Sequence, residues 1–241
     1  LSGFTMTNVT AMKDMFAGCS SLATLDLPTL DVEGVTDMSG VFSGCSSLKE
    51  ANFTSGTNTS GATTMARMFE GCAALTTLDL SSFNTANVTD MGNMFAGCAA
   101  LETLDISGVS TSKVTNMSSL FANDEALTKI TLGAGFAFDE TDETCWLPAG
   151  SWSAKSIADA DENADSSFTA RQIAMDRNNV ADTYTREMML TSAELSETSF
   201  VYNGIKQVPD VVVMSGDRTL IEGTDYEVIP PEDCTNAGEK V

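Results

Sequence analysis

Acidic and hydroxyl side chains recur at a regular interval in the first half of the sequence. They stand beside apolar residues that alternate as in a β-strand. This set, which we call the acidic ladder, consists of Asp26, Glu50, Thr77, Asp79, Thr103 and Asp105. Carboxylates held side by side and partly removed from water repel each other, so they would bind a cation or a hydroxyl-rich ligand such as a sugar. A solvated face that aids solubility is the alternative interpretation.

A second acidic group has the spacing of a calcium-binding loop. Oxygen-bearing side chains stand at every second position, at Asp159, Asp161, Asn163 and Asp165. An EF-hand loop also needs a turn glycine and a bidentate glutamate, and the sequence has alanine at both of those positions. A solvated acidic loop is therefore favoured over this weak calcium candidate, and the sequence predicts no other metal and no cofactor.

Four cysteines recur at intervals of 26, 27 and 26 residues, and they are Cys19, Cys45, Cys72 and Cys98. In stacked repeats their side chains would form one column that points in one direction. A tetrahedral zinc site needs ligands that converge from several directions, which favours buried, reduced thiols over a metal site or disulfides. Cys145 and Cys234 lie outside the period, and the sequence leaves open whether they pair.

Composition and charge exclude several classes of function. The 34 acidic and 12 basic residues give a formal net charge of −22, so nucleic acids and anionic lipids would be repelled. The absence of histidine removes the commonest general base and every histidine-dependent catalytic triad. No apolar run reaches the length of a membrane-spanning helix. We therefore expect a protein that is not an enzyme and that does not insert into a membrane.

A repeat of about 26 residues must position these side chains. Apolar alternation, as at Leu78 and Leu80, predicts one strand per repeat, and the spacing of Met91, Met94 and Phe95 predicts one short helix. Neither element can bury its apolar face alone, so successive copies must stack. The sequence predicts an α/β leucine-rich-repeat solenoid of about five repeats, with a parallel sheet on one side and short helices on the other.

The same period predicts how this architecture packs. Five parallel strands are expected, centred near Leu25, Phe53, Leu78, Leu104 and Ile130. One column of buried rings is expected from Phe16, Phe42, Phe69, Phe95 and Phe121. The recurring methionines stand at helical spacing beside phenylalanine, which is typical of a core rather than of a soft-metal site. They are Met12, Met15, Met38, Met65, Met68, Met91, Met94 and Met117.

The repeat phrase resembles a known family. The run from Asn87 to Cys98, followed by Leu101 to Ile106, is similar to the BspA-like leucine-rich repeats of bacterial surface proteins. The resemblance covers residues 1–136. It implies a cell-surface protein that contacts host or neighbouring cells, and it implies no catalytic residue. One copy departs from the pattern over residues 51–53, where we expect a less regular strand.

The rest of the chain divides into two further regions. Residues 137–189 break the period and contain both tryptophans, so we expect them to cap the repeats of residues 1–136. Residues 190–241 alternate short apolar runs with turn signals such as Asn203-Gly204, which predicts a small all-β domain. Its phrases resemble the immunoglobulin-like modules of bacterial surface proteins. We expect this module to be truncated and the chain to be a piece of a longer exported protein.

Three functions are consistent with these observations. The leading hypothesis is an extracellular adhesin whose acidic ladder binds a protein or glycan on a host or neighbouring cell. The second is a structural spacer of a surface protein, with no ligand of its own. The third is a polysaccharide hydrolase, which the absence of histidine and of any nucleophile motif disfavours.

Overall fold

The computed structural model describes residues 9–27, 32–53, 57–155, 167–176, 180–187, 192–195, 211–215 and 218–219 of the 241-residue chain. The chain divides into two compact units, Leu1–Glu187 and Met188–Val241. Several predicted features lie outside the described residues, namely the calcium candidates Asp159, Asp161, Asn163 and Asp165, and Cys234. None of the described helices is long and apolar enough to cross a membrane.

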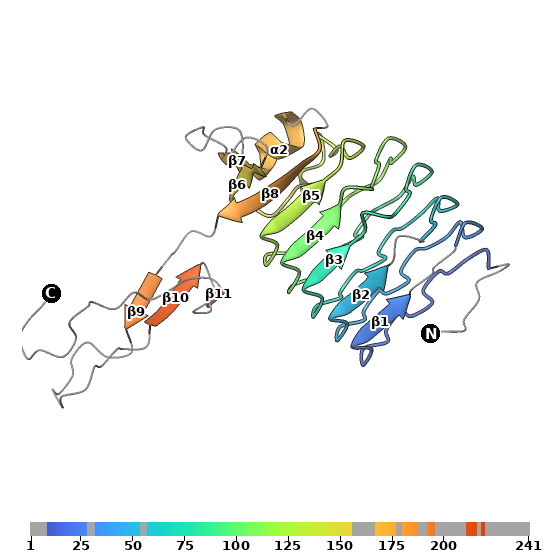
Figure 1. The fold of residues 1–241 in the computed structure, drawn as a ribbon, viewed down its shortest axis with the longest axis horizontal. Coiled ribbons are helices and arrows are strands. Elements are labelled where there is room, and N and C mark those ends of the chain that lie inside the picture. Colours follow the sequence, from blue (N-terminus) through green and yellow to red (C-terminus); the bar gives the residue numbers. More distant parts are fainter. Residues whose placement is uncertain are drawn as a thin grey trace, which may run out of the picture. The chain divides into compact units, whose positions relative to one another are not determined.

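Each repeat contributes one short strand, because alternation of apolar and polar residues gives a strand one face for the core. The strands are β1 (Thr24–Leu27), β2 (Glu50–Phe53), β3 (Thr77–Asp79), β4 (Thr103–Ile106) and β5 (Lys129–Leu132). β1 pairs with β2 in parallel, and β3, β4 and β5 form a second parallel ladder (Figure 1). The five predicted strand positions are therefore correct.

The strands do not form one continuous sheet. Among the described residues, β1 and β2 form a two-stranded sheet, and β3 begins a separate six-stranded sheet. The interruption falls at the copy that departs from the repeat pattern, where Phe53 replaces the usual aliphatic residue. The Phe53 ring packs edge-on against Phe83, with their centroids 5.0 Å apart, and it also contacts Phe42 and Phe69. β2 itself pairs with β1 along all four of its residues, so the expectation of a less regular strand is wrong, and the irregularity lies in the pairing of β2 with β3.

The predicted α/β leucine-rich-repeat solenoid is wrong. The described residues between 9 and 154 form short strands, turns and one 3₁₀ helix, and they contain no α-helix. The α-helix α2 (Ala170–Asp176) lies beyond the repeats. The larger sheet is mixed, since it contains both parallel and antiparallel pairs. The protein is therefore mostly β.

Hydrogen bonding in the turn segments explains why no helix forms there. The N–H groups of Met12 and Asp14 donate to the next repeat, at Asp37 O (2.8 Å) and Ser39 O (2.9 Å). The N–H of Met15 closes a tight turn onto Met12 O (3.1 Å), whereas an α-helix needs N–H groups that donate four residues back. A left-handed residue also interrupts each segment, with φ between 54° and 62°, at Asp14, Gly40, Arg67, Asn93 and Ser119.

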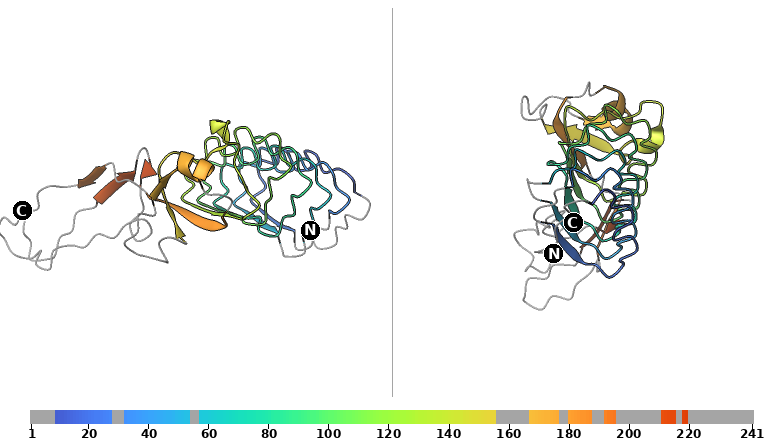
Figure 2. Two further views of the ribbon diagram at one scale, coloured as in Figure 1. Left: turned by 90° about the horizontal axis from the view of Figure 1, so that it is seen from above. Right: turned by 90° about the vertical axis from the view of Figure 1, so that its right-hand side faces the viewer.

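The core contains the predicted column of phenylalanine rings. Consecutive rings from Phe16 to Phe121 stack with centroids 5.3 to 6.1 Å apart. The column lies between the strands and the turns, which form two sides of the first unit (Figure 2). Phe16, at the start of the column, is only half-buried, and the other four rings are buried. Of the eight recurring methionines, seven are buried; the prediction is wrong for Met15, which is 39% exposed.

Three repeat cysteines are buried thiols, as expected. The thiols of Cys45, Cys72 and Cys98 donate to a phenylalanine carbonyl of the preceding repeat at 3.1 to 3.2 Å. Burial raises the pKa of Cys72 to about 12, so this thiol stays protonated. Cys19 is exposed, and the prediction of burial is wrong there, since it lies at the end of the described cysteine column. Cys145 is a buried free thiol.

The segment after the repeats extends the larger sheet. It contains the 3₁₀ helix η1 (Glu143–Cys145) and strands β6 (Ser151–Ala154), β7 (Ser167–Thr169) and β8 (Asp182–Glu187). β8 lies between β5 and β6 and runs antiparallel to both, giving the order β3-β4-β5-β8-β6-β7. Trp152 is fully buried, and its Nε1 donates to Pro148 O at 3.1 Å. The last repeat is therefore covered by hydrogen-bonded strands as well as by apolar side chains.

The second unit is described in part. β9 (Ser192–Leu195), β10 (Val211–Ser215) and β11 (Arg218–Thr219) form an antiparallel sheet in the order β11-β10-β9. Most of the region predicted to be immunoglobulin-like, residues 190–241, lies outside the described residues.

Candidate functional site

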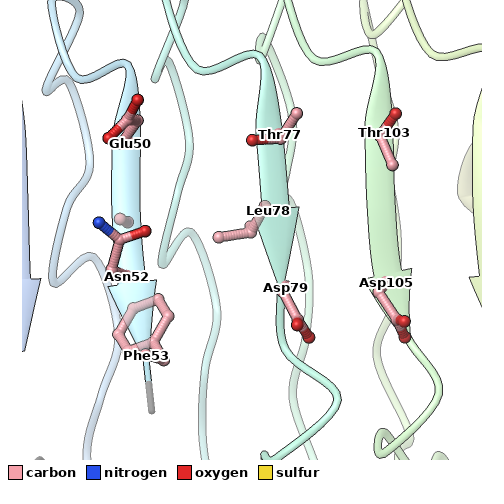
Figure 3. A pocket seen from close by; sticks show the side chains of 9 residues that line it. Glu50, Asn52, Phe53, Thr77, Leu78, Asp79, Thr103 and Asp105 are labelled. Atoms are coloured by element: carbon pink, nitrogen blue, oxygen red, sulfur yellow. The ribbon is translucent and has the colours of Figure 1, made fainter. Parts of the chain in front are cut away.

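Five members of the acidic ladder line one pocket on the sheet. The pocket has a volume of about 350 Å³ and lies over β2, β3 and β4 (Figure 3). We call it the ladder pocket, and it is lined by Glu50, Ala51, Asn52, Phe53, Thr77, Leu78, Asp79, Thr103 and Asp105. The sixth member of the ladder, Asp26, is the register partner of Asn52 on β1, and it does not line the pocket.

The pocket forms where the sheet is interrupted. No described hydrogen-bonded ladder joins β2 to β3. The residue at the core position of β2 is Ala51, whereas the neighbouring strands have leucine at the equivalent positions, Leu25 and Leu78. Ala51 is buried, as Leu25 and Leu78 are, and it lines the pocket together with Leu78. The pocket therefore lies at the copy that departs from the repeat pattern.

Register places the two aspartates of the pocket side by side. Asp79 and Asp105 are Cα partners on adjacent parallel strands, which lie about 4.8 Å apart in a β-sheet. One oxygen of each carboxylate is held by a backbone N–H, from Ser81 at 2.8 Å and from Ser107 at 2.9 Å. The described residues show no hydrogen bond to the other oxygen of either carboxylate. The two groups thus present fixed negative charge to a ligand.

Hydroxyl and amide groups complete the polar lining. Thr77 and Thr103 are register partners, and with Glu50 they form one row, while Asp79 and Asp105 lie in a second row (Figure 3). Exposed carboxylates and hydroxyls at fixed spacing can accept hydrogen bonds from the hydroxyls of a sugar or from an ammonium group. The arrangement suits recognition rather than proton transfer.

The sequence analysis did not identify the apolar part of the pocket. Phe53 is half-buried and lines the pocket beside the acidic ladder, and Leu78 is buried beneath it. An aromatic face next to polar groups can pack against the apolar face of a sugar ring. The departure of the second repeat from the pattern, at residues 51–53, was the signal that could have pointed to Phe53.

The other side chains considered as metal ligands do not meet at one point in the described structure. No group of three or more Cys, Asp or Glu side chains in the described ranges could hold a metal ion. The repeat cysteines form a column along the turns, as their common register requires. The ladder pocket is therefore the candidate site, because five residues of the predicted acidic ladder lie together in it.

Two segments of the chain match the model of one protein family. Residues 1–77 and 50–132 each match the family described as "Mycoplasma protein of unknown function, DUF285". Together they span residues 1–132 of 241, which is more than half of the chain. This match supports the resemblance of the repeats to a family of bacterial surface proteins. No curated protein and no solved structure matches the chain.

Proposed function

We propose that the chain, which belongs to the DUF285 family of Mycoplasma proteins of unknown function, is a non-enzymatic binding protein of a bacterial cell surface. It acts as an adhesin that recognises a protein or glycan of a host or neighbouring cell. The resemblance to bacterial surface proteins supports an extracellular location, and the exposed sheet of the repeats supports adhesion.

The ladder pocket is the observation that carries this proposal. Carboxylate, hydroxyl, amide and aromatic side chains from three strands meet in one volume of about 350 Å³. Pockets of this size that combine an apolar surface with a few converging polar groups are typical of small-ligand sites. The strands hold these groups in place before a ligand arrives, which reduces the entropy that binding costs.

The charge of the pocket determines the chemistry of its ligand. Glu50, Asp79 and Asp105 contribute three carboxylates, and none of the lining residues that the structure describes is basic. The preferred ligand is therefore cationic or rich in hydroxyl groups, such as an amino sugar, a neutral glycan or a basic segment of a protein. Phe53 offers an apolar contact to the same ligand.

A binding screen of the purified chain tests this function. The chain is applied to arrays of immobilised glycans and matrix proteins, together with the variant Asp79→Asn/Asp105→Asn. Asparagine keeps the Oδ1 atoms that accept from Ser81 and Ser107, so the variant removes charge without removing the turns. We expect the chain to bind cationic or neutral hydroxyl-rich ligands and the variant to lose this binding.

Two other outcomes would overturn the proposal. Absence of binding to every array member, with the fold intact by circular dichroism, would support a structural spacer. Release of reducing sugars from common polysaccharides by the chain, and not by the Asp79→Asn/Asp105→Asn variant, would support a hydrolase.

A further inference from the structure

A second pocket lies on the same face of the larger sheet and has the opposite charge. It has a volume of about 410 Å³ and is located over β5, β8 and β6. We call it the cap pocket, and its polar lining consists of Lys129, Thr131, Ser153, Lys155, Thr183 and Thr185. The described lining residues supply two ammonium groups, four hydroxyls and no carboxylate.

Strand pairing places these residues together. Lys129 and Thr131 on β5 are the register partners of Thr185 and Thr183 on β8, and Thr185 in turn pairs with Ser153 on β6. Residues that alternate with them, such as Ile130 and Tyr184, are buried on the other face. Five of the six polar side chains therefore project from a hydrogen-bonded part of the sheet, and Lys155 directly follows β6.

The floor of the pocket is ordered before any ligand binds. The hydroxyls of Thr131 and Thr183 lie 3.1 Å apart and share a hydrogen bond across β5 and β8. Both threonines belong to paired strands, so their backbone positions are fixed by the ladder. A ligand that hydrogen-bonds to these hydroxyls meets a surface that needs little rearrangement.

The two lysines have no carboxylate partner in the described part of the chain. The ion pairs found there join Arg67 to Asp14 and Arg186 to Glu125. Asp105 is the register partner of Thr131 on the neighbouring strand, and it belongs to the ladder pocket rather than to this one. In a chain with 34 acidic and 12 basic residues, two ammonium groups with no acid among the described lining residues are a local reversal of charge.

We propose that the cap pocket is a second ligand site, which binds an acidic saccharide through its carboxylate or sulfate group. The ammonium groups of Lys129 and Lys155 bind the anionic group, and the four hydroxyls bind the hydroxyls of the sugar. This site goes beyond the proposed function, because its residues, its charge and its ligand differ from those of the ladder pocket.

Charge favours a saccharide with few negative charges over a polyanion. The net charge of −22 repels a long polyanion such as a nucleic acid, whereas one anionic group is attracted at close range by two ammonium ions. The hydroxyl lining exceeds what a bare anion needs and matches the many hydroxyls of a sugar. An acidic peptide offers carboxylates but few hydroxyls, so it would form fewer hydrogen bonds with the four hydroxyls of the lining.

Calorimetric titration with a matched set of probes tests this site. The probes are lactose, sialylated lactose, sulfated lactose and inorganic sulfate, each titrated into the full chain. We expect both charged lactoses to bind and lactose and sulfate to bind more weakly by about tenfold, because a charge-assisted hydrogen bond contributes at least this factor. The variant Lys129→Gln/Lys155→Gln should lose a similar factor for both charged lactoses.

Two control variants separate this site from the ladder pocket. Lys13→Gln/Lys113→Gln makes the same change in net charge at exposed lysines outside the pocket, and it should leave the affinities unchanged. Asp79→Asn/Asp105→Asn removes charge from the ladder pocket, and it should not weaken binding of the charged lactoses. Binding of the charged lactoses by the Asp79→Asn/Asp105→Asn variant is expected even if the ladder pocket has no ligand, so the two proposals can fail separately.

Several results would overturn the proposal. Failure of the chain to bind either charged lactose, or full binding by Lys129→Gln/Lys155→Gln, would remove the site. Equal affinity for sulfate and sulfated lactose would show that the sugar makes no contact. Tighter binding of a glutamate-rich peptide, lost in the same variant, would identify a peptide site instead.

Discussion

Asp124 occupies, in the last repeat, the position that a cysteine holds in the repeats before it. Its side chain is fully buried, and its Oδ1 accepts from the N–H of Cys98 at 2.9 Å. Its Oδ2 has no hydrogen-bond partner in the described structure. Burial raises the pKa of Asp124 from 3.8 to about 8, because the charged form is poorly solvated there. The neutral acid, which has a proton to donate as the cysteine thiol does, is therefore favoured near pH 7.

The protonation of Asp124 predicts a dependence of stability on pH. The folded state holds the proton more tightly than the unfolded state, so the stabilisation is complete below about pH 4 and declines until about pH 8. Asp124→Asn is neutral at every pH. The free energy of unfolding of the wild type, minus that of this variant, should fall by up to about 1.4 kcal/mol per pH unit across this window.

Urea unfolding at a series of pH values measures this difference. Asp124→Cys restores the residue of the other repeats and serves as a second neutral variant. A difference that stays constant from pH 4 to pH 8 against both variants would show that Asp124 is ionised in the folded protein.

At the scale of the elements, stacked rings join the repeats. Each turn segment donates N–H groups to the next repeat, and the phenylalanine column follows the same direction through the core. Phe69 is fully buried and stacks on both Phe42 and Phe95. Phe16 stacks on one ring and is half-buried. The column therefore offers an interior position and an end position of the same residue type.

Truncation of Phe69 should destabilise the first unit strongly. Phe69→Ala removes a fully buried ring between two others, and we expect a loss of about 3–5 kcal/mol in the free energy of unfolding. Phe16→Ala, the matched control, should cost less than half as much. Denaturant unfolding provides the comparison. A loss below about 1 kcal/mol for Phe69→Ala, or equal losses for the two variants, would contradict the role of the column.

The strands were predictable because their signal is local. Alternating residues such as Leu78 and Leu104 define a buried face without reference to the rest of the chain. The helix prediction failed because the spacing of Met91, Met94 and Phe95 is shared by helices and by consecutive tight turns. The left-handed φ of Asn93 distinguishes the two, and side-chain spacing does not report φ.

The candidate site was predictable in its polar part. Strand register alone brings Asp79 and Asp105 together. The contribution of Phe53 depends on the interruption between β2 and β3, which involves contacts between separate repeats. The cap pocket depends on β8 pairing with β5 across more than 50 residues of sequence, and no local pattern indicates that pairing.

At the scale of the whole molecule, charge determines which partners can approach. The net charge of −22 attracts cationic ligands from a distance, and under the proposed function the carboxylates of the ladder pocket bind them at close range. Exposed charges are screened beyond about 10 Å at 0.1 M salt. Association of a cationic ligand should therefore slow as salt is added, and dissociation should change less. Stopped-flow mixing at several salt concentrations would show this difference.

Calorimetric titration with a glucosamine trisaccharide tests the central claim most directly. This probe is both cationic and rich in hydroxyls at pH 6, and its N-acetylated form is the neutral comparison. We expect the wild type to bind it and Asp79→Asn/Asp105→Asn to bind about tenfold more weakly. Glu140→Gln/Glu143→Gln, which removes the same charge outside the pocket, should retain the wild-type affinity. Absence of binding by the wild type, or equal affinity of all three proteins, would contradict recognition by the ladder pocket.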